Sequence, residues 1–142
     1  MKSHVSIIFC FDTEASCEGY NNDKRCNMIR RKDECSTEIR EHMRGGDGQV
    51  FIRNLFEKSE LLGRSRMLGV LTLEPGCGVG KHDHQNEQEY FCVLKGDPIY
   101  YDDDEEIQLH EGDVTICEDG HSHSIVNRSD EPAYVLACIL LK

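Results

Sequence analysis

A short segment between Gly76 and Gly96 gathers side chains that commonly bind metal ions. His82 and His84 are separated by one residue, and Glu89 follows five residues later. Successive side chains of an extended chain point to opposite faces, so the two histidines share a face. With a third imidazole from elsewhere in the chain, these neutral imidazoles and one carboxylate would suit a divalent Mn, Fe, Co, Ni or Zn ion. The segment therefore predicts part of a metal site built on a sheet.

A later segment supplies the remaining candidate ligand. His121 and His123 both follow closely on the turn residue Gly120, at the start of a β-favouring run. Either imidazole could approach the first segment. The surface is the expected place for His4, His42 and His110.

Both segments resemble the two signature motifs of the cupin superfamily. The first motif is Gly76, five residues, His82, one residue, His84, four residues, Glu89, six residues, Gly96. The second is Gly112, seven residues, Gly120, two residues, His123, three residues, Asn127. The resemblance favours His123 over His121 and implies His82, His84, Glu89 and His123 as ligands of a divalent transition metal. One departure is Glu118, where the family usually has a proline that serves as a turn residue.

The elements around the motifs have the pattern of an all-β protein. From Val50 onward, short β-favouring runs alternate with Gly, Pro and Asp turns, which indicates a sandwich or closed barrel. The resemblance makes this a double-stranded β-helix, the jelly-roll-like cupin barrel, over residues 48–142. The acidic run 102–106 is expected at a hairpin tip. The apolar run 133–141 is expected to be buried on both faces.

The chain before the barrel divides into two parts. Residues 28–47 are predicted to form an N-terminal arm, in which residues 35–43 are either one helical turn or an arm strand. Residues 1–27 are interpreted as an extension of uncertain status. Its apolar stretch resembles a weak export signal, but acidic residues follow at once, and Met28 is an alternative start.

Composition limits the partners and the compartment. Of the 142 residues, 27 are acidic and 16 basic, and this formal net charge of -11 argues against binding nucleic acid or an anionic membrane. No apolar run approaches the roughly 20 residues that span a bilayer. The eight cysteines contain no Cys-x-x-Cys pair, which favours a reduced, cytoplasmic protein.

Alternation along the predicted strands suggests which side chains line the pocket. Phe91 and Val93 share the face of Glu89, and Ile125 shares that of His123, so these three are candidate substrate-binding residues or plain barrel core. Tyr90, Cys92 and Leu94 should face an outer layer or a partner subunit. We expect a hairpin to bring Glu89 opposite the first two histidines, with His123 approaching from across the barrel.

The candidate basic residues for a substrate carboxylate are Arg53 and Arg66, although surface ion pairs are the simpler account of both.

The resemblance leaves several functions open, because cupins include dioxygenases, oxalate decarboxylases, isomerases, sugar-binding regulators and storage proteins. The first hypothesis is a metalloenzyme that acts on a small carboxylated or oxygenated molecule. The alternative is a non-catalytic module that binds or senses a small ligand at the same metal. The family also implies a homodimer, with residues 48–57 or 28–47 at the interface.

Overall fold

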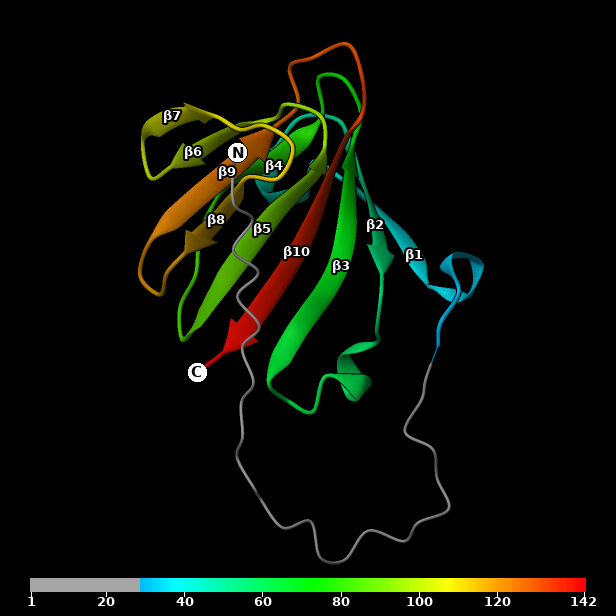
Figure 1. Cartoon of the computed structure of the whole chain (residues 1–142). Helices are drawn as coiled ribbons and strands as arrows, with labels where there is room; N and C mark the ends of the chain where they lie inside the picture. The colour runs from blue at the N-terminus through cyan, green and yellow to red at the C-terminus, as the bar shows by residue number, and fades with distance from the viewer. Residues whose placement is uncertain (1–28) are drawn as a thin grey trace, which may run out of the picture.

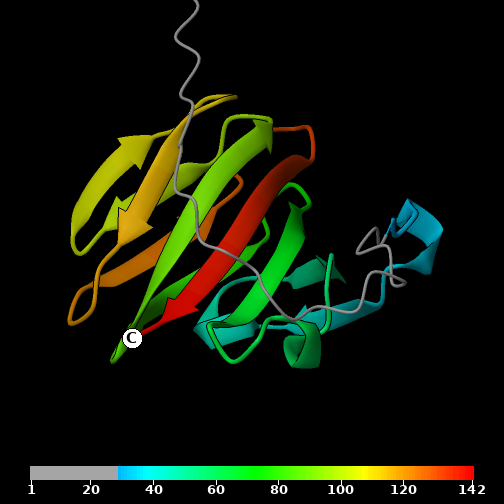
Figure 2. The ribbon, with the colours of Figure 1, turned by 60° about the horizontal axis from the view of Figure 1, so that its bottom comes forward.

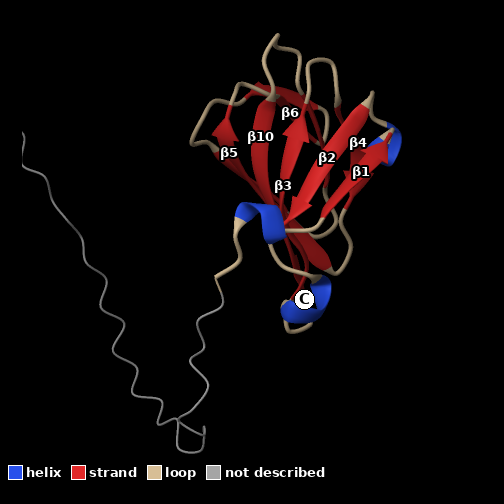
Figure 3. Cartoon of the chain, turned by 90° about the vertical axis from the view of Figure 1, so that its right-hand side faces the viewer, coloured by secondary structure: helices blue, strands red, loops and turns tan. Residues whose placement is uncertain are grey.

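The structure is a computed structural model that describes residues 29–142, so the predicted extension over residues 1–27 lies outside the described residues. The described chain folds into two antiparallel sheets (Figure 1). Strands dominate residues 29–142, and the helical segments in this range are three short 3-10 turns, η1 (Lys32–Glu34), η2 (Met43–Gly45) and η3 (Lys58–Glu60) (Figure 3). The all-β prediction is confirmed.

The larger sheet has six strands that can be followed from right to left across Figure 1. Their order is β1 (Thr37–Glu41), β2 (Gln49–Asn54), β3 (Ser65–Leu73), β10 (Ala133–Leu141), β5 (Glu87–Lys95) and β8 (Val114–Cys117). The smaller sheet has the order β4 (Gly78–Asp83), β9 (Ser122–Val126), β6 (Ile99–Asp102) and β7 (Glu105–Gln108). Figure 2 shows β1 at one side of the molecule, away from β6 and β7 at the other.

The core lies between the sheets because alternate residues of each strand are apolar. Along β5, Glu89, Phe91 and Val93 are buried, whereas the residues between them are only partly covered. The inner residues of β2, β3, β5, β9 and β10 form one apolar cluster. Such alternation is the expected signature of a sheet that covers a core with one face.

The segment that precedes the barrel contributes an edge strand. Of the two alternatives for residues 35–43, the structure shows a strand, because β1 pairs in antiparallel register with β2. The acidic run forms a hairpin tip as expected, since β6 and β7 pair on either side of Asp103 and Asp104.

The expectation that residues 133–141 are buried on both faces is wrong. Along β10, Val135, Ala137 and Ile139 are buried, whereas Tyr134 and Leu140 are exposed. The cause is the layer arrangement: the smaller sheet covers only one face of the larger sheet. The whole run is apolar, yet only the side chains on the inner face of β10 are buried. The side chains on its outer face lie outside the core.

Candidate metal centre

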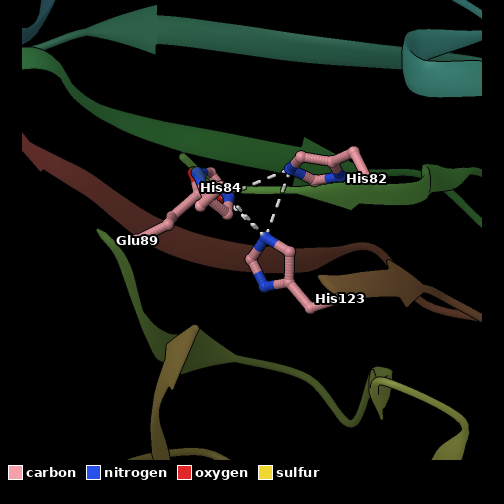
Figure 4. A group of neighbouring side chains, drawn as sticks. All are labelled: His82, His84, Glu89 and His123. Atoms are coloured by element: carbon pink, nitrogen blue, oxygen red, sulfur yellow. Dashed lines mark hydrogen bonds and ion pairs between the residues drawn. The ribbon is translucent and has the colours of Figure 1, made fainter. Parts of the chain in front are cut away.

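Four side chains converge between the two sheets (Figure 4). His82 lies in β4 and His84 directly after it, while Glu89 comes from β5 and His123 from β9. We call these four residues the His/Glu cluster. Three are buried and His82 is partly buried, and one ligand atom from each lies within 4.8 Å of all the others. The sequence prediction that these residues come together thus agrees with the structure.

The distances within the His/Glu cluster are those of ligands around one ion. Nε2 of His123 lies 3.0 Å from Nε2 of His84 and 3.2 Å from Nε2 of His82. Oε2 of Glu89 lies 2.9 Å from His123 Nε2, 3.1 Å from His84 Nε2 and 3.5 Å from His82 Nε2. Ligand atoms bonded at about 2.1 Å to one ion lie about 3 Å apart when they meet at right angles. The donor atoms therefore fit a single transition metal ion.

The strands that carry these side chains are not paired as the sequence analysis expected. β4 and β5 belong to different sheets, so Glu89 faces the histidines across the interior and not as a hairpin neighbour. His123 is the cross-strand neighbour, since it pairs in register with His82. The short turn after His84 carries the chain between sheets, with Asn86 in the left-handed region at φ 58°. A turn of this length could equally have closed a hairpin, which is why the sequence suggested one.

Hydrogen bonds on the far side of two imidazoles point their Nε2 atoms into the cluster. Nδ1 of His82 lies 2.9 Å from the carbonyl oxygen of Gly80, and Nδ1 of His84 lies 2.8 Å from Oε1 of Glu87. Both oxygens can only accept, so each Nδ1 carries a proton and each Nε2 is the coordinating atom. Glu87 is itself held by Arg66 through bonds of 2.6 Å and 2.5 Å.

The third imidazole is fixed by two aromatic neighbours. Nδ1 of His123 lies 3.1 Å from the hydroxyl oxygen of Tyr100. The ring of Phe91 stacks on the His123 ring with the centroids 5.1 Å apart and the planes 15° apart. Burial raises the pKa of Tyr100, so its hydroxyl keeps its proton. The neutral phenol of Tyr100 and the ring of Phe91 thus hold the imidazole of His123 in a fixed orientation.

The protonation states of the His/Glu cluster suit a bound cation. Burial opposes ionisation of Glu89, but hydrogen bonds from His123, His82 and His84 outweigh it and lower the pKa of the carboxyl group. Burial is the main reason that the pKa of His123 is lowered. Burial also acts against the His84 cation, yet bonds to Glu89 and Glu87 raise its pKa overall. The raised pKa means that His84 tends to bind a second proton, and a metal ion that binds Nε2 would displace that proton.

Comparison with known proteins agrees with this geometry. The model of the cupin domain family matches residues 69–139, a span that includes the whole His/Glu cluster. The chain belongs to the cupin family. It is 33% identical over 114 residues to the oxalate-binding protein of Thermotoga maritima, covering 80% of this chain and 94% of that protein. It is also 30% identical to the tetracenomycin polyketide synthase protein TcmJ of Streptomyces glaucescens, over 67% of this chain and 61% of that protein.

Solved structures support the same cupin fold. A predicted oxalate decarboxylase of Thermotoga maritima is 33% identical and superposes with a TM-score of 0.78 over 81% of this chain and all of that chain. A sugar phosphate isomerase from the cupin superfamily of Silicibacter pomeroyi superposes with a TM-score of 0.67 at 22% identity, over 81% of this chain and 76% of that chain. The second likeness shows the fold alone. No helix within residues 29–142 is long and apolar enough to cross a membrane.

A small cavity of the cupin barrel opens beside the His/Glu cluster. Its volume is about 80 Å³, and His82 and Glu89 form part of its wall. The wall also includes four charged side chains, Glu38, Arg40, Arg44 and Arg66. We call this space the arginine cavity. Because a water molecule takes about 30 Å³ in the liquid, there is room for a ligand of only a few heavy atoms.

The other candidates from the sequence lie away from the arginine cavity. Phe91, Val93 and Ile125 are core residues with at most 3% of their surface exposed, and none lines the arginine cavity. Their role in substrate binding stays a prediction. Arg53 lines a separate cavity beside Ile39 and Phe51, whereas Arg66 does line the arginine cavity.

His121 lies outside the His/Glu cluster and bonds Asp103 at 3.0 Å. The second motif also keeps its turn despite the Glu118 departure. The amide of His121 donates to the carbonyl oxygen of Glu118 at 3.1 Å, and Gly120 adopts φ 90°. Asn127 is buried and bonds the carbonyl oxygens of Leu73 and Glu131, so it organises a turn and does not face the metal centre.

Sequence reasoning missed Glu87, Tyr100 and Arg44. Glu87 had a detectable signal, because it lies two residues before Glu89 and so shares its face. Tyr100 and Arg44 belong to neither motif, and only the folded chain brings them to the site.

Proposed function

We propose that this cupin binds a small carboxylate through a divalent transition metal held by His82, His84, Glu89 and His123. Mn, Fe, Co, Ni and Zn all suit such a donor set. The metal would supply positive charge to a ligand oxygen and, if redox-active, a centre for oxygen chemistry. The observation that carries the proposal is the convergence of three Nε2 atoms and one ionised carboxylate oxygen on one point.

The arginine cavity supports a carboxylate as the ligand. It adjoins His82 and Glu89, and three of its wall residues are arginines in a chain whose net charge is -11. Guanidinium groups match the planar geometry of carboxylates. The 33% identical relative is an oxalate-binding protein, and oxalate has a size that suits the cavity.

The second candidate function is decarboxylation of oxalate, favoured by the likeness to a predicted oxalate decarboxylase. The net reaction consumes one proton, breaks the C–C bond and yields formate and carbon dioxide. Glu38 is the carboxylate of the cavity wall that is not a proposed metal ligand, and it would have to carry that proton. Glu38 is already paired with Arg40 at 3.0 Å, and this ion pair would have to open before Glu38 could deliver a proton to the substrate, which favours plain binding.

The test begins with metal content. Protein purified without chelator or affinity metal should contain about one transition metal per chain by elemental analysis. The variant His82→Ala/His84→Ala/His123→Ala should contain almost none. His121→Ala is the matched control and should keep the metal, because His121 lies outside the His/Glu cluster. An empty wild-type protein from metal-replete medium would contradict the proposal.

Calorimetry then tests the ligand. Oxalate should bind the metal-loaded protein and fail to bind the metal-free protein. Release of formate from oxalate, lost in Glu38→Gln while oxalate binding persists, would favour the decarboxylase. Binding without formate would favour the binding or sensing module. Loaded protein that binds no small carboxylate would exclude both.

We also propose that the protein works as a homodimer in the cytoplasm. The five cysteines among the described residues are free, which agrees with a reducing compartment. The exposed apolar side chains of the larger sheet, such as Phe51 and Tyr134, support the dimer.

A further inference from the structure

A turn from outside the two cupin motifs is pressed against the metal-bearing strand. The turn η2 lies against β4, with Gly46 next to Gly78 and Gly80. A Cβ atom on Gly80 would lie 2.2 Å from the carbonyl oxygen of Arg44, and one on Gly46 would lie 2.3 Å from that of Gly78. Only residues without a side chain allow the two backbones to approach this closely. The glycines therefore fix Arg44 relative to His82.

Arg44 holds an unfavourable backbone conformation. Its φ is 56°, in the left-handed region that side chains with a Cβ rarely adopt. The next residue, Gly45, is also in this region at φ 79°. Glycine would suit position 44 better on backbone grounds alone, so the side chain of Arg44 is the feature to explain.

The three arginines of the arginine cavity differ in their partners. Arg40 bonds Glu38 at 3.0 Å and 3.1 Å, and Arg66 bonds Glu87. Arg44 makes no side-chain hydrogen bond or ion pair with any residue in the described part of the chain. Its guanidinium group is thus the one of the three left available for an anion.

We propose that Arg44 binds the ligand carboxylate that is remote from the metal, so that the site selects small dicarboxylates over monocarboxylates. This inference rests on the proposed function, in which the metal takes the first carboxylate. The small cavity then bounds the distance between the two carboxylates, which favours a ligand as short as oxalate. A guanidinium group can bind a carboxylate through two parallel hydrogen bonds, and this geometry rewards a ligand with a second carboxylate.

The experiment measures dissociation constants for oxalate and acetate by calorimetry on protein loaded with Mn²⁺. Arg44→Gln should weaken oxalate about tenfold or more, the usual loss for a charge-assisted hydrogen bond. Acetate affinity and metal content should stay at the wild-type values. Arg44→Lys should recover part of the oxalate affinity, because it restores the charge but not the fork of donors.

Two further variants distinguish a loss of ligand binding from a loss of stability and from a change in net charge. Arg44→Gly relieves the backbone strain, so it should melt no earlier than wild type while losing oxalate affinity as Arg44→Gln does. Arg31→Gln removes the same charge before β1 and outside the arginine cavity, and it should bind oxalate normally.

The inference is overturned if Arg44→Gln binds oxalate within about twofold of wild type, or if oxalate and acetate weaken equally. In either case wild-type oxalate binding would leave the proposed function standing. If wild-type protein holds the metal but binds neither anion, the proposed function fails and the role of Arg44 fails with it.

Discussion

Each imidazole of the His/Glu cluster is oriented by a second residue. Gly80 offers a backbone oxygen to His82, Glu87 a carboxylate to His84, and Tyr100 a hydroxyl to His123. Such partners fix the ring and make the coordinating nitrogen more basic. Among the three, only Glu87 adds a negative charge, and it is also the residue through which Arg66 is tied to the site.

Glu87→Gln should therefore weaken metal binding without emptying the site. The amide oxygen can still accept from His84, but the charge is lost, and we expect the metal dissociation constant to rise about tenfold. Competition with a chromophoric chelator measures the change. Glu106→Gln is the control, because Glu106 bonds Tyr101 on the exposed hairpin and does not touch the cluster. An unchanged dissociation constant in Glu87→Gln would show that Glu87 does not tune the metal.

At the residue scale, the spacing of histidines and glutamate was sufficient to predict which side chains meet. His82, His84, Glu89 and His123 lie at family spacing, and they converge in the fold. Arg44 could not be predicted in this way, since no local pattern relates it to His82. Its position depends on the close approach of two backbones that are distant in sequence.

At the scale of elements, the His/Glu cluster joins the two sheets. β4 and β9 of the smaller sheet carry the histidines, while β5 of the larger sheet carries Glu89. The sequence predicted these strands but assigned the wrong neighbours, because a short turn can close a hairpin or carry the chain between sheets. The pairing of His82 with His123 is set by strand order, which local patterns do not encode.

Since the cluster links the sheets, metal removal should destabilise the whole barrel. Free metal at about a thousand times its dissociation constant adds about 4 kcal/mol to the free energy of unfolding. For a domain of this size, that raises Tm by about 10 °C or more. Calorimetry of metal-free and reloaded protein measures the shift. The triple histidine variant should show no shift, and an equal Tm for both wild-type forms would mean that no metal binds the native state.

At the scale of the whole molecule, the larger sheet leaves one face uncovered. Its exposed apolar side chains are Ile39, Phe51, Leu94, Val114, Ile116, Tyr134 and Leu140. We call this surface the outer face, and it carries two open cavities of about 390 Å³ and 450 Å³. Nε of Arg53, on the same face, is buried without a hydrogen-bond partner among the described residues. Contiguous apolar surface of this kind marks interaction sites.

A second copy of the chain explains the outer face most simply. Closed homodimers are the commonest soluble assemblies, and their interfaces resemble a domain core cut in half. β10 runs through the middle of the larger sheet between β3 and β5, so Tyr134 is the residue to change. The family resemblance implied residues 48–57 or 28–47 at the interface, and a dimer across this face would bury outward-facing residues of both segments, such as Phe51 and Ile39.

Tyr134→Arg should convert the proposed dimer to a monomer. An unpaired guanidinium in an apolar interface loses its hydration, and a two-fold axis places the change in both copies. We expect the dimer dissociation constant to rise about a hundredfold or more, measured by sedimentation velocity over a wide concentration range. Leu62→Arg is the control, because Leu62 is 86% exposed in the turn before β3 and should leave the dimer intact. A wild-type protein that sediments as a single chain at every concentration would rule out the dimer, and the outer face would then need another partner.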